Sequence, residues 1–96
     1  MSDGGEAPLV RELPIINKKG LHARASAKFV QTVELFDADV KVTRNGETVG
    51  GTSIMGLMML SAGIGSSITV ETSGNQAAEA MAALTELLAN RFNEEE

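Results

Sequence analysis

The stretch "ADVKVTRNGETVG", Ala38–Gly50, has the pattern of a β-hairpin. Two valines alternate with Asp39 and Lys41 in its first half, and Asn45-Gly46 is a strong signal for a tight two-residue turn. The segment "ETVG" then returns as a short second strand. Because successive side chains of a strand point to opposite faces, the alternation predicts an antiparallel sheet with one apolar face and one face exposed to water.

The segments on either side of this hairpin predict further strands and three helices. Runs of β-branched residues indicate strands, and apolar residues at helical spacing indicate helices. The expected strands are Leu9 to Ile16, Ala38 to Thr43, 47–50 and Ser66 to Thr72, and the expected helices are about Ala23 to Leu35, from after Ser53 to about Leu60, and about Asn75 to Phe92. The order β-α-β-β-α-β-α predicts an α+β fold with the helices on one side of a four-stranded sheet.

Pro14 places the first of these strands within the sheet. Proline has no N–H to donate to a neighbouring strand, so a strand that contains it is expected at a sheet edge. This position fits a sheet in which the fourth strand lies between the first and the second, an order of 1-4-2-3.

The composition indicates one domain and excludes several kinds of site. Ninety-six residues suffice for a single core. The chain has no cysteine, which excludes disulfides, thiolate catalysis and Cys-based zinc sites, and its one histidine cannot make a His-rich metal site. Its acidic residues show no tight spacing of metal ligands. A net charge of -5 with only three aromatic residues argues against nucleic-acid binding. We therefore expect neither a metal nor a nucleic-acid partner.

The ends of the chain and its longest apolar run bear on its location. The first residues, "MSDGGEAP", lack the basic and apolar regions of a signal peptide. The apolar run Ile54–Leu60 is interrupted by Gly56 and is too short to cross a bilayer. We expect a cytoplasmic protein with a flexible N-terminal extension over residues 1–8, a domain over 9–92 and a frayed acidic tail over 93–96.

Two motifs carry a resemblance to a known family. "GLHARASAKFVQ" (Gly20–Gln31) and "GGTSIMGLMML" (Gly50–Leu60) resemble segments of the HPr family, the histidine-containing phosphocarriers of the bacterial phosphoenolpyruvate-dependent phosphotransferase system. The similarity extends over about residues 9–92 and implies an open-faced β-sandwich. It implies that His22 accepts a phosphoryl group from phosphorylated enzyme I and passes it to enzyme IIA-type proteins, with Arg24 as the adjacent cation.

The local sequence is chemically suited to that role. His22 is predicted at the N-cap of the first helix, where unpaired backbone N–H groups attract an anion. Arg24 can reach phosphoryl oxygens with its guanidinium, although a solvated helix residue would look the same. Nothing in the chain supplies a nucleotide-binding loop or a Mg²⁺ site, so we expect a carrier without a cofactor rather than an enzyme. We also expect it to be a monomer.

The second motif predicts a docking patch and a regulatory residue. The short helix has more large apolar residues than one side can bury, so Met55 and Met58 are expected to be exposed as a surface for partners. The resemblance matches Ser53 to a serine that a regulatory kinase, with its phosphorylase, modifies in many relatives; a plain helix cap would also explain it. Where most relatives have proline this chain has Ala25, which leaves the loop less restrained.

Two alternatives remain at this level. One is a nitrogen-type regulatory phosphocarrier that passes phosphate to a signalling protein instead of a sugar permease. The other is an interaction module that binds regulators through the methionine patch and is never phosphorylated.

Overall fold

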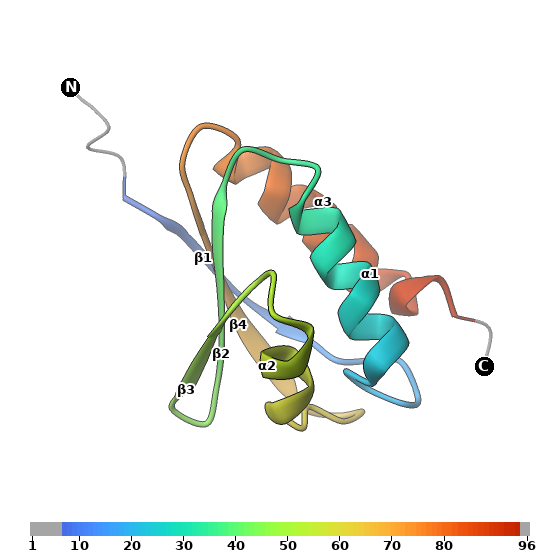
Figure 1. Ribbon diagram of the computed structural model, residues 1–96. Helices are drawn as coiled ribbons and strands as arrows, with labels where there is room; N and C mark the ends of the chain where they lie inside the picture. The colour runs from blue at the N-terminus through green and yellow to red at the C-terminus, as the bar shows by residue number, and fades with distance from the viewer. Residues whose placement is uncertain (1–6, 95–96) are drawn as a thin grey trace.

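The computed structural model describes residues 7–94 (Figure 1). Its elements are β1 (Leu9–Pro14), α1 (Ala23–Val33), β2 (Asp39–Arg44), β3 (Glu47–Gly50), α2 (Ile54–Met59), β4 (Ser67–Ser73), α3 (Ala77–Ala89) and a short 3₁₀ turn, η1 (Arg91–Asn93). The predicted order of strands and helices is confirmed. Of the predicted N-terminal extension, residues 1–6 lie outside the described residues, and Ala7 and Pro8 are exposed and precede β1 without regular structure.

The four strands form one antiparallel sheet in the order β1-β4-β2-β3. The central strand β4 faces β1 on one side and β2 on the other, so that Val70 lies opposite both Arg11 and Val42. Pro14 belongs to the edge strand β1, as its missing N–H predicted. Asn45 and Gly46 both have positive φ, which is the backbone of a tight hairpin turn.

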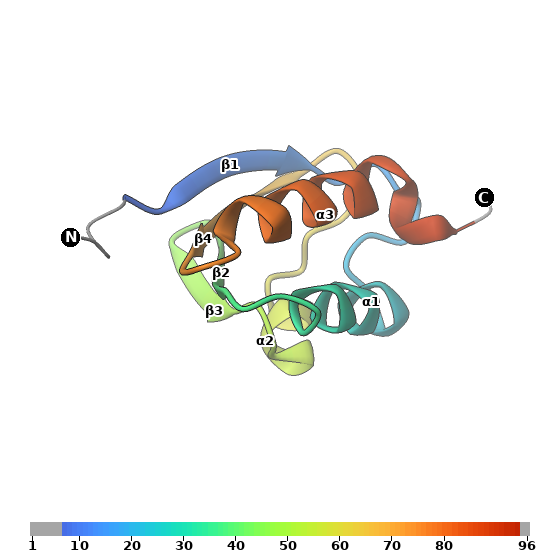
Figure 2. The same cartoon turned by 90° about the horizontal axis from the view of Figure 1, so that it is seen from above.

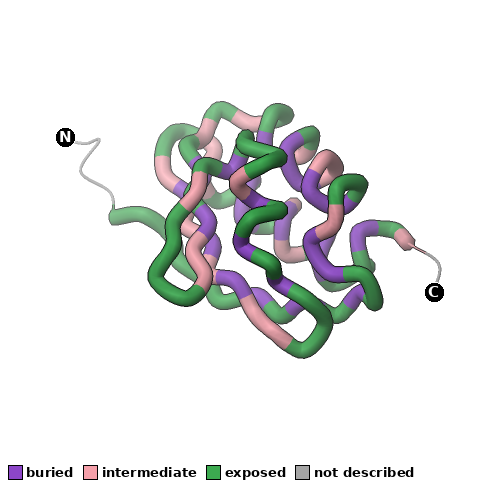
Figure 3. The backbone as a smooth tube through the Cα atoms, turned by 60° about the horizontal axis from the view of Figure 1, so that its bottom comes forward, coloured by how far each residue is buried: buried purple, intermediate pink, exposed green. Residues whose placement is uncertain are grey.

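The helices cover one face of this sheet and leave the other open (Figures 1 and 2). Figure 2 shows α1 and α3 beside each other, and Figure 3 shows the buried stretches along the chain in purple. Alternate residues of β4 are buried, whereas Asp39 and Lys41 of β2 are exposed on the other face. The α+β fold predicted from the order of elements is confirmed, and so is the open-faced β-sandwich that the family resemblance implied.

Two helices end earlier than the sequence predicts. α1 ends at Val33 instead of Leu35, because Glu34 caps it and Leu35 is 75% exposed. α3 ends at Ala89, and the chain then turns through Arg91, Phe92 and Asn93, whose φ values are 54°, 55° and 61°. This left-handed turn explains why Phe92 is fully buried although it does not continue the helix.

The frayed tail predicted from residue 93 is wrong for its first two residues. Asn93 belongs to η1, and Glu94 makes hydrogen bonds with side chains from the first third of the chain. The physical reason is the burial of Phe92, which holds the following backbone against the domain. Glu95 and Glu96 lie outside the described residues.

No helix within residues 7–94 is both long and apolar enough to cross a membrane.

Candidate functional site

The loop before α1 is shaped by a close approach that only glycine allows. Gly20 has φ +65°, and a Cβ added there would lie 2.3 Å from the carbonyl oxygen of Ala62. The next residue, Leu21, donates its backbone N–H to that oxygen at 2.9 Å. The loop after α2 therefore fixes the start of α1, and the turn at residue 20 needs a glycine.

His22 is the N-cap of α1, as predicted. Its backbone is extended, its carbonyl accepts from the N–H of Ser26 at 2.8 Å, and its ring Nδ1 accepts from the N–H of Arg24 at 3.2 Å. The imidazole thereby replaces the hydroxyl or carboxylate that usually caps a helix. A ring nitrogen that accepts from a backbone N–H carries a lone pair and no proton. The side chain of His22 is 27% exposed, so this nitrogen lies at the surface.

The other ring nitrogen is paired with a carboxylate from the far end of the chain. Nε2 of His22 is hydrogen-bonded to Oε2 of Glu94, whose side chain is only 12% exposed. A carboxylate is a hydrogen-bond acceptor, so the neutral ring that fits both contacts carries its proton on Nε2. The arrangement leaves Nδ1 as the ring nitrogen that carries the lone pair.

Glu94 is also held by the side chain of Asn17. Its Oε1 accepts from Nδ2 of Asn17 at 3.1 Å, and the same amide donates to the carbonyl of Gly20 at 2.8 Å. Burial by itself raises the pKa of the Glu94 carboxyl, but the hydrogen bonds from Asn17 and His22 outweigh it, and the positive charge of Lys28, together with that of His22 whenever its ring is protonated, lowers the pKa further. The pKa of Glu94 is therefore below its ordinary value of 4.5.

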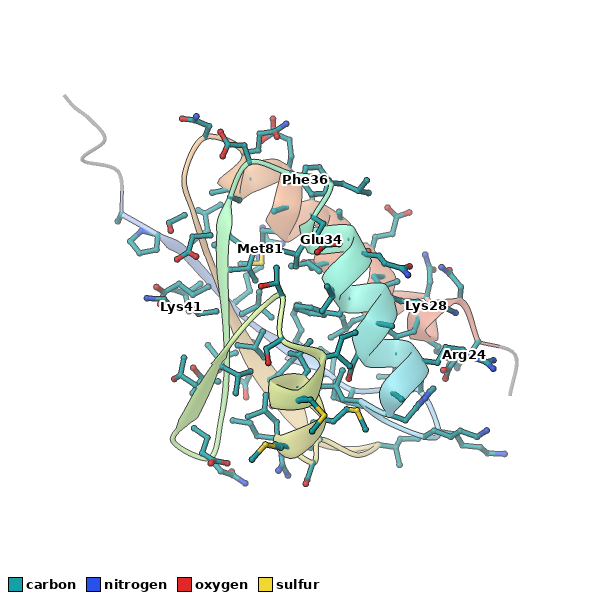
Figure 4. All side chains as sticks on the ribbon, viewed as in Figure 1. Arg24, Lys28, Glu34, Phe36, Lys41 and Met81 are labelled. Carbon is teal, nitrogen blue, oxygen red and sulfur yellow. The ribbon has the colours of Figure 1, made fainter. Side chains whose placement is uncertain are left out.

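A basic concavity surrounds the exposed edge of His22. It has a volume of about 620 Å³ and is lined by Lys18, Lys19, His22, Ala23, Arg24, Lys28, Asn93 and Glu94. Figure 4 shows Arg24 and Lys28 on the side of α1 that faces the C-terminal segment. Within residues 7–94 no hydrogen bond or ion pair engages the guanidinium of Arg24, so it can bind an anion beside His22.

Comparison with known proteins agrees with this geometry. The family model described as "PTS HPr component phosphorylation site" matches residues 9–90. The phosphocarrier protein HPr of Cupriavidus necator is 58% identical over 88 residues, which cover 92% of this chain and 99% of that protein. The chain belongs to the HPr family. It is accordingly a phosphocarrier of the phosphotransferase system and not an enzyme.

Solved HPr structures have the same fold. HPr-C-His from Thermoanaerobacter tengcongensis superposes with a TM-score of 0.86 at 36% identity, over 92% of this chain and 99% of that one. An HPr dimer from the same organism superposes with a TM-score of 0.72 at 38% identity, over 85% and 94% of the two chains. The family match ends at residue 90, so the segment that carries Glu94 lies beyond it.

Sequence reasoning placed His22 and Arg24 at the site but missed Glu94 and Asn17. Asn17 lies five residues before the histidine, and nothing in its local pattern indicates that it is fully buried. The one signal for Glu94 was Phe92, two residues earlier, which is the last apolar residue at helical spacing in the expected third helix. A buried aromatic residue near the end of a chain holds its neighbours against the domain as well.

The second HPr motif forms an exposed apolar surface. Ser53 caps α2, and its Oγ accepts from the N–H of Gly56 at 2.9 Å. Met55 is 70% exposed and Met58 39% exposed, which confirms the predicted exposure. The α2 patch is larger than predicted, because its exposed residues are Ile54, Met55, Met58 and Met59.

The loop that follows α2 lies beside His22. A shallow hollow lined by Lys19, Leu21, His22, Ser61, Ala62 and Gly63 joins the histidine to the loop that follows α2.

Ala25, where the resemblance implied a proline, is fully buried in the first turn of α1. The small side chain belongs to the hydrophobic core, so the position packs without proline.

Proposed function

We propose that His22 accepts a phosphoryl group from phosphorylated enzyme I on Nδ1 and donates it to enzyme IIA-type acceptors. The observation that supports this most directly is the state of the ring: Nδ1 faces the N-terminus of α1, while Nε2 is occupied by Glu94. Nδ1 is therefore available to form a bond to phosphorus as the bond between phosphorus and the donor atom of enzyme I breaks.

The surroundings of Nδ1 suit a group that must arrive and leave. Backbone N–H groups at the start of α1 and the guanidinium of Arg24 supply positive charge for the phosphoryl oxygens. We propose that Arg24 stabilises the phosphoryl group during transfer. Because the concavity is open and not an enclosed cage, the phosphoryl group stays accessible to a second protein, as a carrier requires.

We propose the α2 patch as the docking surface for enzyme I and the acceptors, with Met55 and Met58 among its contacts. Methionine side chains adapt to several partner surfaces, and the patch lies next to the loop that contacts His22. On this proposal the protein acts as a monomer, because each partner must reach the same surface in turn. We propose the cytoplasm as its location.

We also propose that Ser53 is a regulatory phosphorylation site for a serine kinase and its phosphorylase. The residue is exposed, and it adjoins Ile54 and Met55 of the α2 patch. A dianionic phosphate there would have to be desolvated, or would repel an acidic partner, when the patch is covered.

The decisive experiment is phosphorylation by enzyme I and phosphoenolpyruvate, followed by mass measurement and ³¹P NMR. The wild type should gain one acid-labile phosphoryl group, with the phosphorus signal of an Nδ1-phosphohistidine, and His22→Ala should gain none. An unlabelled wild type in the presence of active enzyme I would overturn the proposal.

A further inference from the structure

The segment that follows α3 is held in a conformation that its residues do not favour. Arg91, Phe92 and Asn93 all have left-handed φ values, which L-residues other than glycine rarely adopt consecutively. Such a backbone persists only where surrounding contacts hold it. We call residues 90–94 the C-terminal strap.

Two contacts hold the strap against the domain. The ring of Phe92 is fully buried in the hydrophobic core. The ammonium group of Lys28 on α1 donates to the carbonyl oxygen of Phe92 at 2.6 Å. This unfavourable turn brings Glu94 from the end of α3 to Asn17 in the loop before α1 and to the ring of His22.

The two oxygens of Glu94 have separate partners, and both partners are donors. Oε1 accepts from Nδ2 of Asn17, and Oε2 pairs with Nε2 of His22. Asn17 is fully buried, and its Nδ2 also donates to the carbonyl of Gly20. The ionised carboxylate of Glu94 accepts hydrogen bonds through both of its oxygens and donates none. Its contact with Nε2 of His22 therefore requires a proton on Nε2.

We propose that Glu94 is a positioning residue for phosphoryl transfer: it holds His22 as the Nε2–H tautomer and balances the charge that the ring gains. The inference rests on the proposed function and deepens it. When the lone pair of Nδ1 forms the bond to phosphorus and the donor's bond to phosphorus breaks, Nε2 keeps its proton. The ring then carries a positive charge beside the carboxylate, and the return step removes that charge again.

Glu94→Gln tests this directly, because glutamine has one acceptor oxygen where glutamate has two. If that oxygen accepts from Asn17, the amide group faces Nε2 of His22 and favours the tautomer with its proton on Nδ1, which cannot attack phosphorus. Glu34→Gln is the matched control: Glu34 is exposed and lies at the far end of α1 from Arg24 (Figure 4). Glu94→Asp keeps the negative charge, so it should retain part of the preference for the Nε2–H tautomer that Glu94→Gln loses.

The readout is the ¹⁵N spectrum of His22, which is unambiguous because the chain has one histidine. At about pH 8.5, where an ordinary imidazole is neutral, the wild type and Glu34→Gln should be protonated on Nε2, and Glu94→Gln should move toward Nδ1–H. Transfer from phosphorylated enzyme I should slow by about tenfold or more in Glu94→Gln and stay within about twofold in the control. Thermal unfolding of each variant separates these effects from loss of fold.

The outcomes distinguish this inference from the proposed function. If the wild type is phosphorylated and Glu94→Gln keeps both the Nε2–H tautomer and the control's rate, the positioning role is wrong. If the wild type is not phosphorylated, the proposed function fails. The tautomer comparison still decides whether Glu94 orients the ring.

Discussion

Phe92→Ala should destabilise the protein and at the same time detach Glu94 from His22. The side chain of Phe92 is fully buried. A phenylalanine buries roughly 150–200 Å², which at about 25 cal/mol per Å² corresponds to about 4–5 kcal/mol. Measured costs of removing a buried phenylalanine are about 3–5 kcal/mol. We expect the lower part of that range, because the left-handed backbone at residues 91–93 can relax once its anchor is gone.

Urea unfolding measures the stability, and the ¹⁵N spectrum of His22 measures the contact with Glu94. Phe36→Ala is the control, because Phe36 is only half-buried and lies near the end of α1 remote from Arg24 (Figure 4). Phe36→Ala should lower the free energy of unfolding by less than Phe92→Ala does and should leave the ¹⁵N spectrum of His22 unchanged. If Phe92→Ala lowers the free energy of unfolding by less than about 1 kcal/mol, or leaves the ¹⁵N spectrum of His22 unchanged, Phe92 does not anchor the strap.

Four further changes test the site and its surroundings. Arg24→Ala should slow phosphoryl transfer about tenfold and leave urea unfolding nearly unchanged, since a charge-assisted contact contributes about 1.5–3 kcal/mol; a wild-type rate would make Arg24 a solvated residue only. Gly20→Ala should cost at least about 1–3 kcal/mol in urea unfolding, because φ is +65° and the new Cβ would meet Ala62. The stability difference between wild type and Glu94→Gln should be constant above pH 4.5 and shrink as the pH falls below it, since the folded pKa of Glu94 is lowered; a difference that grows in acid would contradict that direction. Ser53→Asp should slow phosphorylation by enzyme I more than it lowers the melting temperature, and equal kinetics would leave Ser53 as a helix cap.

Local patterns predicted the parts of the fold that depend on neighbouring residues. The hairpin around Asn45-Gly46 was predictable because the turn and the alternation on either side of it are local properties. Pro14 indicated an edge strand because the missing N–H is a property of that residue alone. The cap at His22 also follows from position, since the helical pattern begins one residue later.

The ends of the helices were less predictable. The apolar spacing of α3 continues to Phe92, and the sequence carries no glycine to mark a left-handed turn after Ala89. The helix ends there because Phe92 reaches the core by turning back, with Lys28 bonded to its carbonyl. This choice depends on contacts between residues 64 positions apart, which no local window contains.

The sequence by itself determined the class of fold, the order of its elements and the place of the single histidine at the start of a helix. These follow from periodicity, turn chemistry and capping, which act over a few residues. Only the tertiary structure decided which nitrogen of His22 carries the proton. That choice depends on Glu94, which lies 72 residues away and reaches the ring only because burial of Phe92 offsets an unfavourable backbone turn.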